Sequence, residues 1–335
     1  MMGRRTFIAG ISSAAATASV PWPLKGYGQQ AAPVRQIGVL LVGSPEGIAP
    51  RLPALLQALQ ESGFVEGRNL ALQYRSAEGN YERFPALAAD FVRLEVDAIF
   101  AFAGPRSVVA AKGATTTIPI VFAIGEDPVK MGLVDSFARP GHNVTGVTFM
   151  VEGITPKKRF ELLREFAPAA ARVAVLINPS DTTSIESVIA DARAAAGVMG
   201  LQIEVLMAAD SREIDVAFDS LADRRIAALV VYPSQFYSER RVQLASLAAC
   251  HALPAIYFDR RLAEAGGLVS YGTDFTDMYR QVGLRIGRIL NGENPGAIPV
   301  TQVTKFDLVI NLRTAKQLGI EVPSTLAAMA DKLIE

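Results

Sequence analysis

The sequence predicts an α/β protein made of two doubly wound, Rossmann-like lobes joined by a strand hinge. From residue 36 onward, short apolar strands alternate with amphipathic helices, which indicates parallel sheets covered by helices on both faces. The same alternation begins again near residue 171, so the second half resembles the first in pattern. No Pro/Gly/Ser-rich linker separates the halves, and the boundary at 143–152 is itself strand-like. This favours two lobes joined by strand crossings over two domains on a tether.

The first half begins with a continuous apolar run at 36–42, as expected for a strand buried on both faces. Leu52, Leu55 and Leu59 then recur at helical spacing, and they place an amphipathic helix after this strand. The remaining segments repeat the alternation. The predicted strands are 36–42, 69–74, 98–102 and 118–124, and the predicted helices are 49–61, 81–94 and 105–114.

The second half continues in the same order and ends with a long amphipathic helix at 275–291. Its apolar runs are again short, which indicates strands, and the segments between them show helical periodicity. The predicted strands are 171–177, 202–207, 228–232, 255–258 and 268–271. The predicted helices are 155–166, 183–199, 211–223, 238–250 and 275–291.

Composition excludes several classes of function. The 335 residues include 33 Lys and Arg against 33 Asp and Glu, so the chain has no basic footprint for nucleic acid. A single Cys excludes an intramolecular disulfide and a thiolate zinc site, and two His leave little material for imidazole chemistry. We therefore expect no metal and no cofactor. Cys250 is expected to be a small buried apolar residue.

The first residues predict an export signal. Arg4 and Arg5 precede a weakly apolar run at 11–20 and a stretch of small and polar residues, which is the anatomy of a twin-arginine signal peptide. The apolar run is shorter than the roughly 20 residues that a membrane-spanning helix needs. A chance Arg pair in a cytoplasmic tail is the alternative. We expect a signal peptide over 1–28, export by the twin-arginine pathway, and a periplasmic protein without a membrane anchor.

In doubly wound sheets, ligands bind outside the carboxyl ends of the strands. Two lobes that face each other would form a cleft there. The loops predicted to line this cleft are 43–48, 103–107, 125–130, 178–182, 232–236, 259–262 and 272–274.

Four ordered blocks of sequence carry a resemblance to a known family. They are 118–129 (IPIVFAIGEDPV), 138–146 (ARPGHNVTG), 264–272 (EAGGLVSYG) and 304–312 (TKFDLVINL). They resemble the ABC-transporter substrate-binding proteins whose characterised relatives bind tryptophan and related aromatic amino acids. The similarity covers nearly all of residues 34–335. The chain departs from the family pattern at 103–107, where it carries Arg106, and at 233–236, where relatives often place an Asp.

The resemblance implies a type I periplasmic binding protein fold that closes around a small molecule. The expected lobes are 34–145 plus about 272–303, and 146–271 plus about 304–335. The implied partners are a small-molecule ligand and an ABC permease with its ATPase, and we expect a monomer. Aromatic or branched amino acids are the ligands favoured by the resemblance. An aromatic or aliphatic carboxylate comes next because of Arg106.

Five candidate ligand-binding residues lie in the first lobe. Arg106 and Ser107 are placed where a strand turns into a helix, so backbone N–H groups and a guanidinium could together hold a carboxylate. Gly104 belongs to the same turn, and Ser44 could donate to the same group. Asp127 could hold a ligand donor. The alternatives are a solvated Arg, a turn-forming Ser and an Asp that caps the next helix.

The other candidates lie in the second lobe or at its boundary. Asn178 and Ser234 follow strands and could supply polar contacts or cap helices. Tyr232 could stack on an aromatic ligand, although an aromatic at a strand end also suits the core. Asp259 and Asp274 could pair with a ligand ammonium group. For Asp259, an ion pair with the Arg residues that follow it is the alternative.

No catalytic motif is present. The sequence has no G-x-S-x-G elbow, no phosphate-binding P-loop and no H-E-x-x-H. A transcription regulator on the same fold would need an N-terminal helix-turn-helix, and the predicted signal occupies that place. The sequence therefore favours a solute binder. A periplasmic ligand sensor for a receptor, or a small-molecule enzyme on the same two-lobed fold, remain the alternatives.

Overall fold

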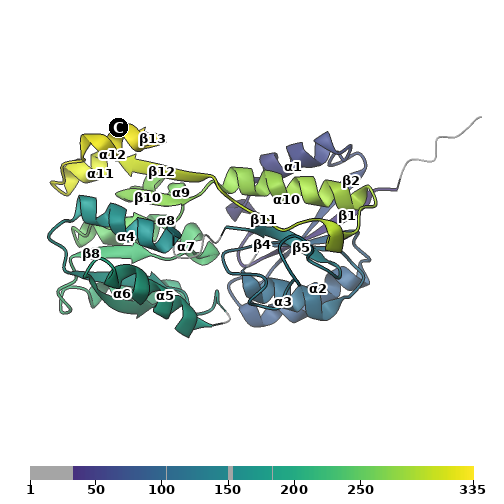
Figure 1. The fold of residues 1–335 in the computed structure, drawn as a ribbon, viewed down its shortest axis with the longest axis horizontal. Coiled ribbons are helices and arrows are strands. Elements are labelled where there is room, and N and C mark those ends of the chain that lie inside the picture. Colours follow the sequence, from purple (N-terminus) through teal and green to yellow (C-terminus); the bar gives the residue numbers. More distant parts are fainter. Residues whose placement is uncertain (1–32, 103, 150–153, 183) are drawn as a thin grey trace, which may run out of the picture. The chain divides into compact units, whose positions relative to one another are not determined.

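Two β-sheets, each covered by helices on both faces, make up the protein in a computed structural model that describes residues 33–102, 104–149, 154–182 and 184–335 (Figure 1). The predicted signal peptide lies outside the described residues. We call the first sheet with its helices the first lobe, and the second sheet with its helices the second lobe. Residues 34–335 cluster as one unit.

The first sheet has six strands in the order β11-β5-β4-β3-β1-β2, and all of its neighbouring strands are parallel. Its apolar runs are buried along nearly their whole length, as the sequence predicts for strands covered on both faces. The strands are β1 (Arg35–Leu41), β2 (Leu70–Ser76), β3 (Ala98–Ala101), β4 (Ile120–Ile124), β5 (Val144–Thr148) and β11 (Thr301–Gln302).

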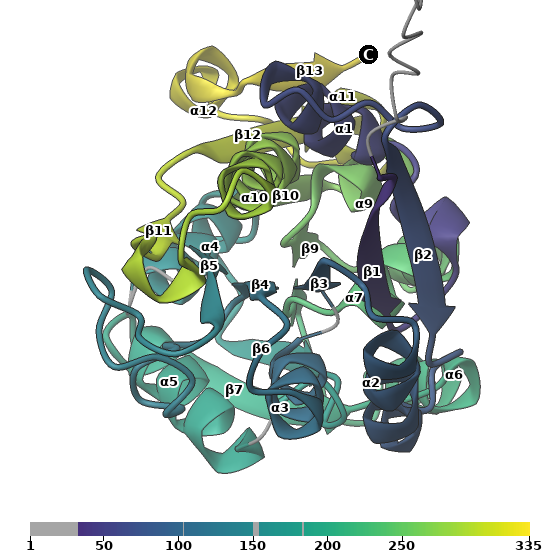
Figure 2. The ribbon, with the colours of Figure 1, turned by 90° about the vertical axis from the view of Figure 1, so that its right-hand side faces the viewer.

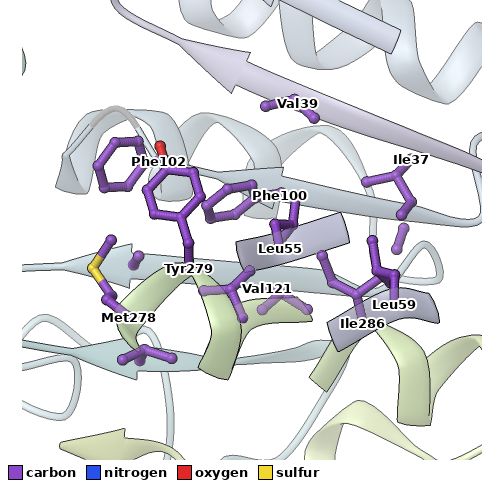
Figure 3. Packing of buried hydrophobic residues seen from close by; sticks show 14 of the residues in the cluster. Ile37, Val39, Leu55, Leu59, Phe100, Phe102, Val121, Met278, Tyr279 and Ile286 are labelled. Atoms are coloured by element: carbon purple, nitrogen blue, oxygen red, sulfur yellow. The ribbon is translucent and has the colours of Figure 1, made fainter. Parts of the chain in front are cut away.

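Helices α1 (Leu52–Glu61) and α10 (Phe275–Leu290) cover one face of the first sheet, and α2 (Phe84–Arg93) and α3 (Pro105–Ala114) cover the other (Figure 2). Phe100 of β3 meets Tyr279 of α10 edge to face at 5.7 Å between ring centres (Figure 3). Short 3-10 turns complete the lobe: η1 (Pro45–Gly47), η2 (Tyr81–Arg83) and η3 (Pro295–Ala297).

The second sheet has seven strands in the order β13-β12-β10-β9-β8-β6-β7. Its strands β10 and β12 are antiparallel, so the wholly parallel sheet expected from the sequence is corrected at this pair. The reason is that β12 follows a crossing from the other lobe and not a helix of its own lobe. The strands are β6 (Arg172–Ile177), β7 (Gln202–Met207), β8 (Ala228–Val231), β9 (Ala255–Tyr257), β10 (Val269–Thr273), β12 (Phe306–Asn311) and β13 (Lys332–Ile334).

Two layers of helices cover the second sheet. The cluster of buried residues on one face draws on α4, α5, α11 and α12, and that on the other face on α6 to α9. The predicted helix at 238–250 is split in two, at Arg240. The helices are α4 (Ile154–Phe166), α5 (Ile185–Gly197), α6 (Ser211–Asp219), α7 (Gln235–Glu239), α8 (Arg241–Cys250), α9 (Arg260–Glu264), α11 (Leu312–Gln317) and α12 (Ser324–Met329).

The two lobes share one topology. The first sheet contains the order β2-β1-β3-β4-β5, and the second contains β7-β6-β8-β9-β10, which is the same arrangement. In each sheet the order reverses at one point, between β1 and β3 and between β6 and β8. Ligands of doubly wound proteins bind at such a reversal, at the carboxyl ends of the strands. Topology therefore locates a candidate site independently of any motif.

The chain passes between the sheets three times: after β5, after β10, and between β11 and β12. Strand β5 stays in the first sheet as far as Thr148, and β10 stays in the second as far as Thr273. Both crossings thus come a few residues later than the sequence suggested. Helix α10 lies against α1 and belongs to the first lobe.

Three further features bear on function. Cys250, expected to be buried, is exposed at the end of α8. Within the described residues, no helix is long and apolar enough to cross a membrane. The same residues contain no group of three or more His, Cys, Asp and Glu side chains placed to hold a metal ion.

Candidate functional site

Loops at and beside the two topological reversals come into contact with each other. The first lobe contributes the loops around Gly43, Tyr81, Gly104 and Glu126, and the second lobe contributes segments 178–182, 234–239 and 259–261. We call these loops the interlobe face. They follow the carboxyl ends of the strands, as expected for a ligand site in this topology.

The loop after β6 contacts the first lobe through Asp181. The hydroxyl of Tyr81 in η2 donates a hydrogen bond to Asp181 Oδ1. Gly104 stands opposite, with a φ of 74°, and a Cβ added there would lie 3.1 Å from the backbone oxygen of Asp181. The positive φ and the close approach both require glycine. Gly104 therefore allows the turn before α3 to approach the loop of the second lobe closely.

Asp181 and Glu126 bring two carboxyl groups together across the interlobe face. Burial raises the pKa of Asp181 to about 6, although Ser234, Tyr81 and Arg106 favour its charged form. Burial raises the pKa of Glu126 to about 8, and the neighbouring charge of Asp181 adds to this effect. Among the described residues, Asp181 Oδ2 is buried and accepts no hydrogen bond.

Helix α7 adds two more polar side chains. The carboxyl group of Glu239 lies against the first lobe, where a Cβ added to Gly43 would come within 1.9 Å of Glu239 Oε1. Within the described part of the chain, that oxygen and both polar atoms of the Gln235 amide are buried without hydrogen-bond partners. Burial raises the pKa of Glu239, and the nearby Arg240 and Arg261 oppose the shift. Buried polar groups without partners are uncommon in folded proteins, so their concentration here is informative.

A buried ion cluster joins the lobes beside this region. Arg51 Nη2 lies 2.6 Å from Asp259 Oδ2, and Arg261 Nη2 lies 3.0 Å from the same oxygen. Ser238 donates to that oxygen at 2.9 Å, and Arg261 also donates to the carbonyl of Gly47 at 2.8 Å. Burial alone would raise the pKa of Asp259, but Arg51 and Arg261 together hold it well below its usual range. The two guanidinium groups therefore favour the charged form of Asp259.

Aromatic rings adjoin the polar groups. Phe149, which follows β5, contacts Phe275 at the start of α10 with 5.8 Å between ring centres. The guanidinium of Arg51 lies 4.2 Å from the centre of the Phe275 ring. Phe149 also covers Gly125, where an added Cβ would meet its ring at 2.7 Å. Apolar surface therefore lies against Gly125, the residue that precedes Glu126.

The first-lobe residues predicted from sequence lie in different settings. Gly104 and Arg106 are on the interlobe face, where Arg106 Nε points to the Thr182 carbonyl at 3.5 Å and Nη1 to Glu82 at 3.3 Å. Ser107 is buried and donates to the Gly104 carbonyl at 2.7 Å. Ser44 is exposed before η1. Asp127 accepts from two backbone N–H groups of its own turn, and because no helix follows it before β5 among the described residues it does not cap one.

The second-lobe candidates divide in the same way. Ser234 caps α7 and receives a hydrogen bond from Asn178 at 3.4 Å, and both side chains are buried near Asp181. Tyr232 packs in the core on the α4 face of its sheet. Asp259 belongs to the ion cluster. Asp274 caps α10 by accepting from the N–H groups of Thr276 and Asp277.

Asp181, Glu126, Glu239 and Gln235 were not among the predicted site residues. Each follows a strand end within or next to a loop that the sequence had marked, so the strand-end rule was sufficient to include them. The choice of side chain within each loop failed because burial of these groups depends on the opposite lobe.

Two hollows lie on the second lobe, away from the interlobe face. One, of about 680 Å³, lies against β7 and α6, and the other, of about 300 Å³, lies against α4 and α12.

Two doubly wound lobes whose strand-end loops meet around buried polar groups define a type I periplasmic binding protein fold. The chain belongs to the ABC transporter substrate binding protein family, whose model matches residues 36–334. This confirms the resemblance predicted from the sequence. The family consists of binding proteins, so the enzyme alternative is not supported.

Individual relatives agree with this assignment. The chain is 25% identical over 287 residues to a tyrosine-binding protein of Clostridioides difficile, covering 86% of this chain and 81% of that protein. A conserved domain protein from Vibrio cholerae superposes with a TM-score of 0.82 at 26% identity, over 90% of this chain and 99% of that one. A domain from Streptococcus pneumonia in complex with L-Trp superposes with a TM-score of 0.80 at 23% identity, with the same coverage of both chains.

Proposed function

We propose that this protein captures a small carboxylate-bearing solute between its two lobes and delivers it to an ABC permease and its ATPase. The main support is the set of buried polar groups without partners, among the described residues, where the strand-end loops of both lobes meet. A ligand that supplies hydrogen bonds to such groups removes an energetic penalty of about 1–3 kcal/mol for each.

The proposed solute is an amino acid, aromatic or branched. A tyrosine-binding relative and an L-Trp-bound structural neighbour support this class. Phe149 and Phe275 provide apolar surface beside the polar groups. Arg106, with the N-terminal turn of α3, is the proposed contact for the ligand carboxylate, because guanidinium and backbone N–H groups both favour anions there.

Closure of the lobes around the solute is the proposed mechanism. The chain superposes better on the L-Trp complex, with a TM-score of 0.80, than on a ligand-free, open substrate-binding protein from Clostridium difficile, with 0.63. Identity is slightly higher to the open structure, at 26% against 23%, so sequence distance does not explain the difference. The ligand would shift the population toward the closed form.

We further propose that the protein is a periplasmic monomer exported by the twin-arginine pathway. The pair Arg4 and Arg5 ahead of a short apolar run supports this, as does membership of a family of transport binding proteins. Cell fractionation with and without a functional twin-arginine translocase tests export. Replacing both arginines by lysine should retain the protein in the cytoplasm.

Thermal-shift screening tests the choice of solute. Ligand at about 100 times its dissociation constant stabilises a protein by about 2.7 kcal/mol, which is a readily measured shift in melting temperature. We expect L-tryptophan, L-tyrosine or L-leucine to give such a shift and Arg106→Ala to reduce it sharply. A panel in which only non-amino-acid carboxylates stabilise the protein would contradict the amino-acid assignment.

A further inference from the structure

We propose that Asp181 and Glu126 form the subsite for the ligand's ammonium group. This inference rests on the proposed function and adds to it the residues that would select ligands bearing an amine. Neither side chain was identified from the sequence, and the two come from opposite lobes.

Geometry places both carboxyl groups where a bound solute would lie. Asp181 follows β6 at the topological reversal of the second lobe, and Glu126 follows β4 of the first lobe. The carbonyl of Glu126 accepts from Thr148 at 3.2 Å, which ties its backbone to the end of β5 next to Phe149. A ligand amine at the carboxyl groups would therefore have an aromatic ring beside it.

One oxygen of Asp181 is held in place and the other is available. Tyr81 donates to Oδ1 and so fixes the carboxyl group against the first lobe. Oδ2 is buried and has no hydrogen-bond partner of good geometry among the described residues, although the Ser234 hydroxyl lies close enough to favour the charged carboxylate. A buried carboxylate oxygen without a donor is costly, and an ammonium group supplies donors together with opposite charge.

The surroundings favour a cation over an anion at this point. Asp181 lies close enough to raise the pKa of Glu126, Tyr81 and Tyr237 are nearby, and Arg106 is the cation that acts on Asp181. Arg106 is partly exposed and already lies 3.3 Å from Glu82. Arg51 and Arg261 are held by Asp259. Two like charges brought together by closure repel each other unless a proton or a cation lies between them.

This arrangement links binding to proton release. Burial in the closed form raises the pKa of Glu126 to about 8, with Asp181 adding to the shift, so closure without a bound cation favours the protonated form of Glu126. An ammonium ligand replaces that proton, because its charge favours both carboxylates. Binding of an amino acid should thus release up to one proton, and its affinity should rise between pH 6 and pH 8.

The test is calorimetric titration of L-tryptophan and L-tyrosine in phosphate and in Tris, whose ionisation enthalpies differ. Wild type should bind with proton release. Asp181→Asn and Glu126→Gln should each weaken binding at least tenfold, and Glu126→Gln should abolish proton release. Glu186→Gln, an exposed acid a few residues from Asp181, is the matched control and should behave as wild type.

Two analogues separate the subsite from the overall function. Indole-3-propionate lacks the amine, and it should bind wild type weakly and lose nothing further in either variant. If indole-3-propionate binds as tightly as L-tryptophan, or if both variants keep wild-type affinity, the ammonium subsite is wrong while solute capture stands. If no amino acid, amine or carboxylate binds, the proposed function fails as well. Melting curves of both variants establish that they are folded.

Discussion

The side chains of Asp259 and Asp181 show how surroundings assign different roles to the same carboxyl group. Burial of the carboxyl group by itself raises the pKa of each. Asp259 lies between two arginines, and these hold its pKa well below the usual range. For Asp181, Ser234, Tyr81 and Arg106 do not offset the effect of burial, and its pKa rises to about 6. Asp259 is therefore suited to joining the lobes, whereas Asp181 keeps the capacity to respond to a ligand.

Asp259→Asn should destabilise the protein by about 3–5 kcal/mol, because it leaves the buried guanidinium of Arg51 without its counter-charge. Urea unfolding at pH 7 measures this loss. Asp307→Asn, which breaks the partly exposed pair with Arg260, is the control and should cost about 1 kcal/mol or less. Equal losses of unfolding free energy in the two variants would show that burial of the Arg51–Asp259 pair adds nothing to stability.

Glu126 should make the ligand-free protein less stable as the pH rises. Its folded-state pKa of about 8 exceeds the ordinary value of 4.5, so the folded protein holds this proton more tightly than the unfolded chain. The resulting contribution is complete below about pH 4.5 and is lost as the pH rises through 8. Unfolding free energies measured from pH 5 to pH 8 should fall, and Glu126→Gln should flatten the slope. Glu186→Gln is the control and should keep the wild-type slope. An unchanged slope in Glu126→Gln would exclude Glu126 as the source of the pH dependence of the unfolding free energy.

At the scale of elements, local chemistry explains what the sequence predicted. Strand β7 and helix α3 have the bounds that the sequence pattern predicted, because a short apolar run and Pro at the first helical position are local signals. Asp274 acts as the helix cap that its position suggested, and Asp127 accepts hydrogen bonds within its own turn. A cap reaches only two or three residues along the chain, so the sequence contains all that is needed to predict it.

The site could be predicted only as far as its loops. Tyr81 and Asp181 are 100 residues apart, and nothing near either one shows that they meet. Burial of Glu126 likewise depends on the loop after β6 in the other lobe. The strand-end rule identifies the loops because it follows from topology. The choice of side chain within a loop depends on contacts between lobes, which periodicity does not encode.

Helices α1 and α10 approach closely at Gly283. A Cβ added there would lie 2.6 Å from the Leu55 carbonyl oxygen and 2.8 Å from Ala58 Cβ. Gly283→Ala should therefore push the helices apart and destabilise the protein by about 1–3 kcal/mol, measured by urea unfolding. Gly113→Ala in α3 meets no atom within 4 Å and should be neutral or stabilising by up to about 1 kcal/mol. Similar effects in both variants would contradict the steric explanation.

At the scale of the whole molecule, Gly43 of the first lobe is the position against which the Glu239 side chain of the second lobe packs. The three atoms nearest to an added Cβ all belong to the carboxyl group of Glu239, so a side chain at this position first meets the opposite lobe. Gly43→Leu should act as a wedge that leaves each lobe intact and opposes closure. Gly43→Ala should have a smaller effect, because the end of the flexible Glu239 side chain can move aside.

Small-angle scattering tests this expectation. Addition of L-tryptophan to wild type should reduce the radius of gyration, whereas Gly43→Leu should show little compaction and at least tenfold weaker binding. The double variant Gly43→Leu/Glu239→Ala removes part of the opposing side chain. It should therefore recover part of the compaction and part of the binding affinity. Melting temperatures of the ligand-free variants should stay near that of wild type, because the wedge acts only between the lobes. Full compaction of Gly43→Leu with tightly bound ligand would mean that closure does not bring Glu239 against Gly43, and the hinge mechanism would need a different contact surface.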